Sequence, residues 1–221
     1  AQSIWQLSGA IGLIGIFAAI YHPVGIAMLI QSNQRIGFRL GVNGVFGNMG
    51  VAAAPLLIGV LLTMGDWRLC FAVSGLFCIA YGVAFVMALD GDAPSPSRSA
   101  KKGSSGFAPN WKLALGAMLL STASGGFIFG AMTFVVPRYF EISLTGISTS
   151  VAMTGLLAAI VYAVASFSQV GVGWLIDRVP PKWVLMAIGA GQVVFVALTA
   201  LYTDYALFFA MLVAMSFVFG Q

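Results

Sequence analysis

Residues 69–88 read LCFAVSGLFCIAYGVAFVMA, a stretch without a charged side chain. About 20 consecutive apolar residues are what an α-helix needs to cross the roughly 30 Å hydrocarbon core of a bilayer. The stretch also lacks the alternation of polar and apolar residues that marks a strand of a membrane β-barrel. It therefore predicts a transmembrane helix.

The rest of the chain repeats this pattern. Apolar residues make up 60% of the 221 positions and charged residues only 7%, a composition that a water-soluble domain could not cover with polar surface. We therefore expect an all-α polytopic membrane protein. Apolar blocks and the polar residues between them predict seven spans, at residues 8–31, 39–63, 68–89, 112–136, 149–174, 183–202 and 205–221.

One connection differs from the others. Residues 90–110 read DGDAPSPSRSAKKGSSGFAPN, and this mixture of Pro, Ser, Gly and charge predicts a solvent-exposed linker. The linker separates two helical regions, residues 1–89 and 111–221. Because the sequence starts at Ala1 rather than at Met and stops at Gln221 within an apolar run, we expect both ends to be cut from a longer chain.

The charged residues lie between the spans and indicate orientation. Ten Lys and Arg residues stand against six Asp and Glu residues. Alternating loops place Arg68 and Arg138 on one side of the membrane and the other basic residues on the opposite side, which the positive-inside rule assigns to the cytoplasm together with linker 90–110. The positive charge therefore indicates orientation, and we expect no nucleic-acid partner.

Several functional classes lack the residues that they require. Cys70 and Cys78 are eight residues apart, about 12 Å along a helix, too far for a disulfide. With one histidine in the whole chain there is no metal-binding motif and no catalytic pair, and no phosphate-binding loop occurs. No span interior carries the lysine that retinal would need. We therefore expect neither an enzyme nor a cofactor or a metal.

Two motifs resemble a known family. Residues 50–59 place the small residues Gly50, Ala54 and Gly59 about one helical turn apart, with Pro55 directly after Ala54. This spacing lets another helix approach closely, and the stretch is similar to the fifth-helix motif of the major facilitator superfamily. A second stretch, residues 173–182, reads GWLIDRVPPK and resembles the family's cytoplasmic loop signature. The matching positions are Gly173, Leu175, Asp177, Arg178 and Lys182.

The resemblance implies an architecture and a mechanism. The seven spans correspond to helices four to ten of a twelve-helix, bacterial-type transporter, with residues 1–89 in the N-terminal bundle and residues 111–221 in an incomplete C-terminal bundle. Such proteins move small solutes by alternating access between two bundles. We expect a monomeric secondary transporter in the bacterial cytoplasmic membrane, proton-coupled and favouring efflux. The alternative is a non-transporting membrane protein, or a remnant, with a degraded facilitator fold.

The loop signature implies a role for Asp177. A carboxylate in this loop can dock on the positive N-terminal end of a helix and stabilise the state closed to the cytoplasm. We expect the helix that Asp177 meets to lie beyond Gln221. Correspondingly, the loop that meets Arg35, Arg39 and the start of span 39–63 is expected before Ala1.

A few polar residues inside the spans are candidates for the substrate or proton site. His22 is the only ionisable side chain deep within a span, and such residues are functional candidates by default. It could carry a proton, bind substrate, or only make a helix contact beside Pro23. In the span that corresponds to helix seven, a polar cluster and a nearby aromatic residue are the other candidates: Ser121, Thr122, Ser124 and Phe127.

Overall fold

The computed structural model describes residues 3–30, 35–88 and 110–221, and its regular structure consists of helices. The helices are α1 (Ile4–Ile30), α2 (Ile36–Met64), α3 (Trp67–Ala88), α4 (Trp111–Ser143), α5 (Val151–Ser166), α6 (Ser168–Ile176), α7 (Pro181–Thr199) and α8 (Asp204–Phe219). Except for Asn110, the predicted linker at 90–110 lies outside the described residues.

The predicted all-α membrane fold is confirmed. Six helical segments in the described part of the chain are long and apolar enough to cross a bilayer, and α8 is a shorter apolar helix. The predicted span at 149–174 consists of α5 and α6, which form one continuous apolar segment. They are separated at Phe167, whose N–H donates to the Val164 carbonyl at 3.2 Å. This hydrogen bond spans three residues instead of the usual four, so the helix is locally tighter and α5 is separated from α6.

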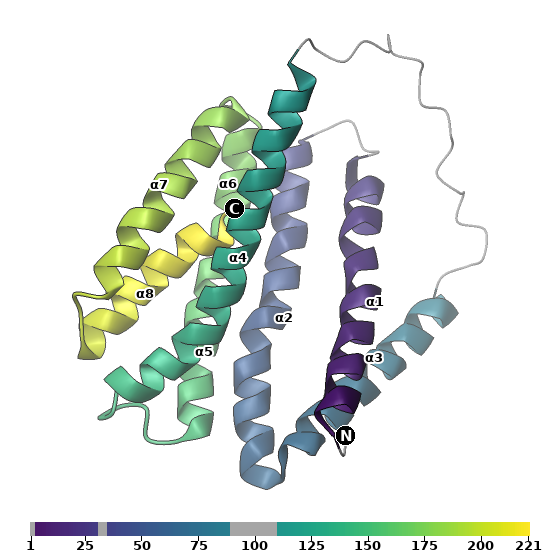
Figure 1. The fold of residues 1–221 in the computed structure, drawn as a ribbon, viewed down its shortest axis with the longest axis vertical. Coiled ribbons are helices and arrows are strands. Elements are labelled where there is room, and N and C mark those ends of the chain that lie inside the picture. The colour runs from purple at the N-terminus through teal and green to yellow at the C-terminus, as the bar shows by residue number, and fades with distance from the viewer. Residues whose placement is uncertain (1–2, 31–34, 89–109) are drawn as a thin grey trace.

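The helices run up and down between two ends of the molecule (Figure 1). At one end, which we call the basic end, lie Arg35, Arg178 and Lys182. At the opposite, acidic end lie Asp66 and Glu141 in or next to short connections. At the acidic end the Arg68 side chain and backbone N–H hydrogen-bond to Asp66 and hold the pKa of its carboxyl group below its usual value.

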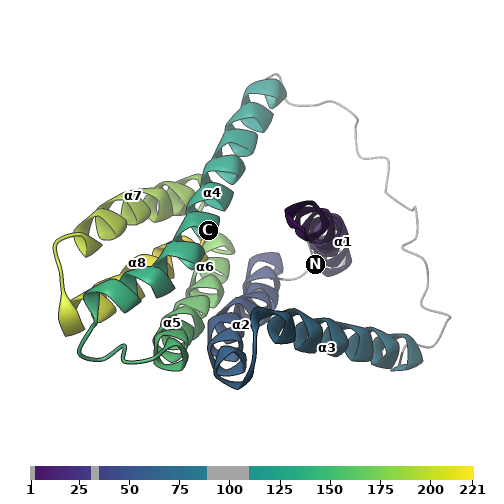
Figure 2. The same cartoon turned by 60° about the horizontal axis from the view of Figure 1, so that its bottom comes forward.

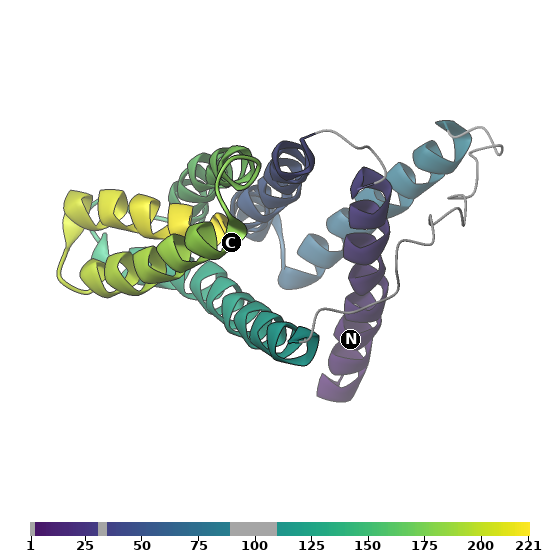
Figure 3. The same ribbon diagram turned by 90° about the horizontal axis from the view of Figure 1, so that it is seen from above.

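The core is built from α4, α5 and α8. Tyr162, Phe140 and Phe219 are its largest fully buried side chains, and Ala52 of α2 packs against the same cluster. Figures 2 and 3 show α7 and α8 on one side of the molecule, α1 and α3 on the other, and α2 between them beside α5 and α6. The apolar residues of α1 and α3 are mostly exposed, which suits contact with lipid or with further helices.

Glycines bring α2 into close contact with α5 and α6. A methyl group at Gly37 would collide with the Gly173 carbonyl, and one at Gly155 would collide with the Pro55 carbonyl. The first contact lies at the basic end and the second near the acidic end, so the two backbones approach at both ends of the interface. Small residues permit this packing in membrane helices.

Helix α4 is longer than predicted. The sequence predicted its end at residue 136, before Pro137, whereas the helix continues to Ser143 with Pro137 inside it. Proline has no N–H and therefore frees the carbonyl four residues earlier, here that of Thr133. The Tyr162 hydroxyl donates to this carbonyl at 2.9 Å, so a neighbouring helix supplies the missing donor.

Candidate functional site

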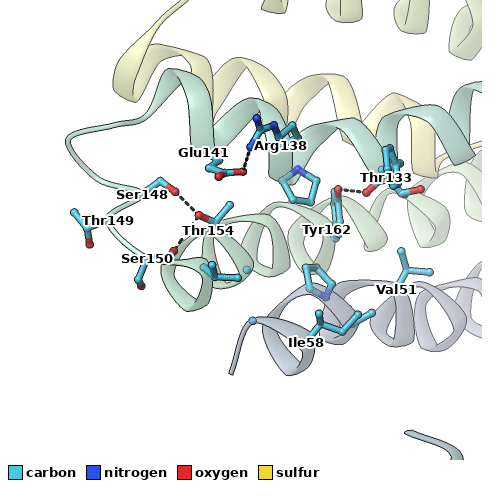
Figure 4. Close-up of a pocket in the computed structure, with 17 residues that line it drawn as sticks. Val51, Ile58, Thr133, Arg138, Glu141, Ser148, Thr149, Ser150, Thr154 and Tyr162 are labelled. Carbon is cyan, nitrogen blue, oxygen red and sulfur yellow. Dashed lines mark hydrogen bonds and ion pairs between the residues drawn. The ribbon is translucent and has the colours of Figure 1, made fainter. Parts of the chain in front are cut away.

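A large cavity of about 740 Å³ opens between α2, α4 and α5 near the acidic end (Figure 4). The residues of α2 that line it are apolar or glycine and include Val51, Pro55 and Ile58. The α5 helix begins beside the cavity because the Ser150 hydroxyl accepts the N–H of Met153 and caps it. The residues that line the cavity are Val51, Ala54, Pro55, Ile58, Gly59, Thr133, Phe134, Pro137, Arg138, Glu141, Ser148, Thr149, Ser150, Val151, Thr154, Gly155 and Tyr162.

The polar groups of the large cavity come from α4, α5 and the loop between them. Arg138 donates to Glu141 at 2.6 Å, one turn along α4, so the two charges balance one another. The hydroxyl groups of Ser148 and Thr154 are hydrogen-bonded to each other. The cavity thus offers apolar contact on its α2 side and hydrogen-bonding groups on the other, the lining typical of small-molecule sites.

A second site lies at the basic end, where Asp177 follows α6. The backbone N–H of Gly37 donates to one carboxylate oxygen of Asp177 at 2.8 Å, and the N–H of Phe38 donates to the other at 2.9 Å. Both N–H groups belong to the first turn of α2, where the backbone N–H groups have no acceptor within the helix. The negative charge also lies at the positive end of the α2 dipole.

This contact corrects one expectation. We expected Asp177 to meet a helix beyond Gln221, and we expected the start of α2 to meet a loop before Ala1. Instead the two meet each other. The expectation was wrong because it treated each loop as docking within its own bundle, whereas the close approach at Gly37 and Gly173 brings the α6–α7 loop onto α2.

The other residues of the loop signature shape the turn around Asp177. The Leu175 carbonyl accepts the N–H groups of Arg178 and Val179, which closes the turn after α6. The Arg178 guanidinium lies 3.9 Å from the centre of the Trp174 ring, and Lys182 lies over the ring of Trp183. Pro181 is the first residue of α7, a position that proline favours.

The four residues of the predicted fifth-helix motif have different surroundings. Gly59 and Pro55 contact α5, where a methyl group at Gly59 would lie 2.9 Å from the Val151 carbonyl oxygen. Ala54 lines the large cavity. A methyl group at Gly50, by contrast, would meet nothing within 4 Å.

The candidate residues in the first and fourth predicted spans lie elsewhere. His22 is exposed on α1, and the α4 candidates are exposed along the half of that helix nearer the basic end. None of them lines the large cavity. As substrate or proton residues they therefore stay predictions: His22, Ser121, Thr122, Ser124 and Phe127.

Sequence reasoning missed the polar residues of the large cavity. The sequence alone does not single out Thr133, Arg138 or Glu141 as site residues, yet all three line the large cavity. Two signals could have found the site. Tyr162 is an aromatic residue with a polar tip inside an apolar span, and Pro137 within a helix leaves a carbonyl that needs a donor.

These features define a class of protein: a polytopic helical membrane protein with glycine-packed helices, a cavity between them and a carboxylate docked on a helix N-terminus. A family model described as Major Facilitator Superfamily matches residues 1–221. The chain belongs to the major facilitator superfamily, whose members are membrane transporters, rather than enzymes, that take small-molecule substrates. No curated protein and no solved structure matches the chain.

Proposed function

We propose that the protein is a secondary active transporter that moves a small solute across a bacterial cytoplasmic membrane by alternating access. In this proposal α1–α3 belong to an N-terminal bundle and α4–α8 to a C-terminal bundle, connected by linker 90–110. The basic end faces the cytoplasm, as the positive-inside rule favours. Transport is proton-coupled, with efflux favoured over uptake.

The contact between Asp177 and α2 carries the proposal. Its two hydrogen bonds connect the start of α2 to the loop after α6, and therefore one bundle to the other. They can form only when the bundles are together at the basic end. We call this contact the Asp177 latch. Because it is made in one state and broken in another, it biases a two-state equilibrium towards the state closed to the cytoplasm.

The large cavity supports the same mechanism. It lies between α2 of one bundle and α4 and α5 of the other, so a relative movement of the bundles changes its shape. Solutes that bind there contact an apolar wall and the hydroxyl-rich side around Ser148 and Thr154. This placement makes the cavity our candidate for the substrate site on the route to the acidic end.

A transport assay tests the proposal. The protein is reconstituted into vesicles and screened with labelled solutes under a pH gradient of either direction. We expect at least one solute to be moved and its flux to follow the gradient. If no solute in a broad panel moves while the protein remains folded, the alternative of a non-transporting relative is favoured.

Variants separate the latch from the proton site. For any transported solute, Asp177→Asn is expected to reduce the flux, and Asp204→Asn at the acidic end serves as the matched control. His22→Ala is expected to remove the dependence on pH if His22 carries the proton. Unchanged flux in Asp177→Asn contradicts the latch, and an unchanged pH profile in His22→Ala excludes His22 from coupling.

A further inference from the structure

A smaller cavity at the basic end is separate from the large cavity. It has a volume of about 300 Å³ and is lined by Arg35, Phe38, Trp174, Asp177 and Arg178. Arg35 directly precedes α2, and Arg178 follows α6 by two residues. The cavity, which we call the arginine pocket, thus lies across the junction that Asp177 closes.

The arginine pocket has an excess of positive charge. Both oxygens of the Asp177 carboxylate accept backbone N–H groups of α2, so this carboxylate faces α2. The ion pairs found among the described residues are Arg68–Asp66 and Arg138–Glu141, both at the acidic end. Within that part of the chain, therefore, neither Arg35 nor Arg178 has a carboxylate partner. Anions are favoured in such a setting.

Arg178 is held in position to bind an anion. Its guanidinium stacks on the Trp174 ring at 3.9 Å and donates one hydrogen bond to the Trp174 carbonyl at 3.0 Å. A guanidinium carries five N–H donors, so most remain available. Their planar arrangement matches the oxygens of a phosphate group.

The aromatic residues of the pocket are partly exposed among the described helices. On α6, Ser168 and Val172 are the residues next to Gly220 at the end of α8. Trp174 follows Val172 by two residues, about 200° further around the helix, and so points away from α8. Trp174 is 49% exposed and Phe38 is 40% exposed. Half-exposed aromatic residues beside basic ones are typical of the bilayer interface.

We propose that the arginine pocket binds the phosphate group of an anionic phospholipid from the cytoplasmic leaflet. A lipid fits better than a soluble phosphate because the exposed aromatic residues lie at the ends of apolar helices, the depth of the bilayer interface, where acyl chains can lie against them. Basic pockets between helices on the cytoplasmic side are suited to acidic headgroups. A phosphate held by both Arg35 and Arg178 would also stabilise the Asp177 latch, a consequence that rests on the proposed function, whereas binding itself does not.

Native mass spectrometry of the purified protein measures this binding directly. The protein is titrated with phosphatidylglycerol, and with zwitterionic phosphatidylcholine for comparison. We expect retention of phosphatidylglycerol to weaken about fivefold in Arg35→Gln and in Arg178→Gln, the effect of about one surface charge on lipid binding. Lys112→Gln removes one charge beside Trp111 at the same end, outside the pocket, and is expected to bind like the original protein.

A conservative variant and a competition with inorganic phosphate complete the binding experiment. Arg178→Lys keeps the charge but loses the planar fork, so we expect an intermediate affinity, and its milder change guards against loss of folding. Millimolar inorganic phosphate should not displace the lipid. Equal retention of phosphatidylglycerol by Arg178→Gln and Lys112→Gln would show that the arginine pocket is not the binding site. Displacement by inorganic phosphate, or equal retention of phosphatidylcholine, would instead show that the pocket does not select an anionic lipid.

Discussion

The two ends of the interface between α2 and the α5–α6 segment are closed in different ways. At the basic end Gly37 meets Gly173, and a charged carboxylate also accepts two N–H groups of α2. At the acidic end Gly59 and Gly155 approach the opposite backbone, and no charged side chain among the described residues forms a hydrogen bond across this contact. Hydrogen bonds to ionised groups are stronger than neutral ones. The comparison predicts that the acidic end opens more readily than the basic end.

The same comparison explains where the cavities lie. The large cavity is at the acidic end, beside the contact that has no charged hydrogen bond, and the arginine pocket is at the basic end, beside the Asp177 latch. A solute in the large cavity can therefore exchange without breaking the latch. Under the proposed function, the protein rests closed to the cytoplasm.

The largest effect is expected at the closest backbone contact. In Gly173→Ala the added methyl group collides with the Gly37 carbonyl, and overpacking of this kind costs about 3 kcal/mol. The basic end should then remain open. The carbonyl of Gln169 on α6 packs against Gly41 of α2 in the same contact. Labelling of Gln169→Cys by an impermeant maleimide, in a background with Cys70 and Cys78 replaced by serine, measures this opening.

Gly171 provides the matched control for this variant. It lies on the same helix, but a methyl group there meets nothing within 4 Å. We expect Gly171→Ala to label like the parent. Equal labelling of Gly173→Ala and Gly171→Ala would mean that close backbone contact does not hold the basic end closed.

The next effect concerns charge alone. Asp177→Asn keeps the shape of the side chain but removes the negative charge from the positive end of α2. The charge–dipole interaction and the hydrogen bonds to the charged group together contribute about 2 kcal/mol to the stability of the closed basic end, which the variant loses. The cysteine at position 169 should label more than tenfold faster. Asp204→Asn should not change the rate, and a similar increase in both variants would contradict the latch.

At the acidic end the expected effect is smaller. In Gly59→Ala the added methyl group would lie 2.9 Å from the Val151 carbonyl oxygen and 3.1 Å from the Cα atom of Ala152, so the start of α5 must shift, but by less than the closer overlap at Gly173 demands. We expect a cost of about 1 kcal/mol, measured as a lower midpoint of thermal unfolding in detergent. Gly50→Ala, which has open space around it, is the control. A larger fall in the unfolding midpoint for Gly50→Ala than for Gly59→Ala would contradict the conclusion that Gly59 makes the closer contact.

The sequence carried enough information for the fold but not for all of the sites. Span length and composition predicted the helices because lipid demands apolar residues along a whole crossing. The loop signature predicted that Asp177 docks on a helix N-terminus, and in the structure Asp177 accepts two N–H groups at the start of α2. Its partner was misassigned because residue spacing in one chain does not say which helix N-terminus a distant carboxylate reaches.

The large cavity was harder to predict for a related reason. Its residues come from α2, α4 and α5, and only packing brings Pro55 near Gly155. The span was predicted to end at residue 136 from the extent of its apolar block. The longer helix contains Pro137, and the carbonyl that this proline frees accepts a hydrogen bond from Tyr162, a residue of another helix that no local pattern identifies.

This hydrogen bond gives the smallest expected effect and the most specific test of how α4 continues past Pro137. Tyr162→Phe leaves the Thr133 carbonyl without its donor, and interhelical hydrogen bonds in membranes contribute about 0.6 kcal/mol on average. The thermal midpoint should fall slightly. In a Pro137→Ala background, the substituted alanine supplies an N–H four residues after Thr133, so the helix itself satisfies the carbonyl. There Tyr162→Phe should cost less, and the double-mutant cycle measures the difference. If the cost is the same in both backgrounds, Tyr162 stabilises the wall of the large cavity by packing alone, and the continuation of α4 past Pro137 needs another cause.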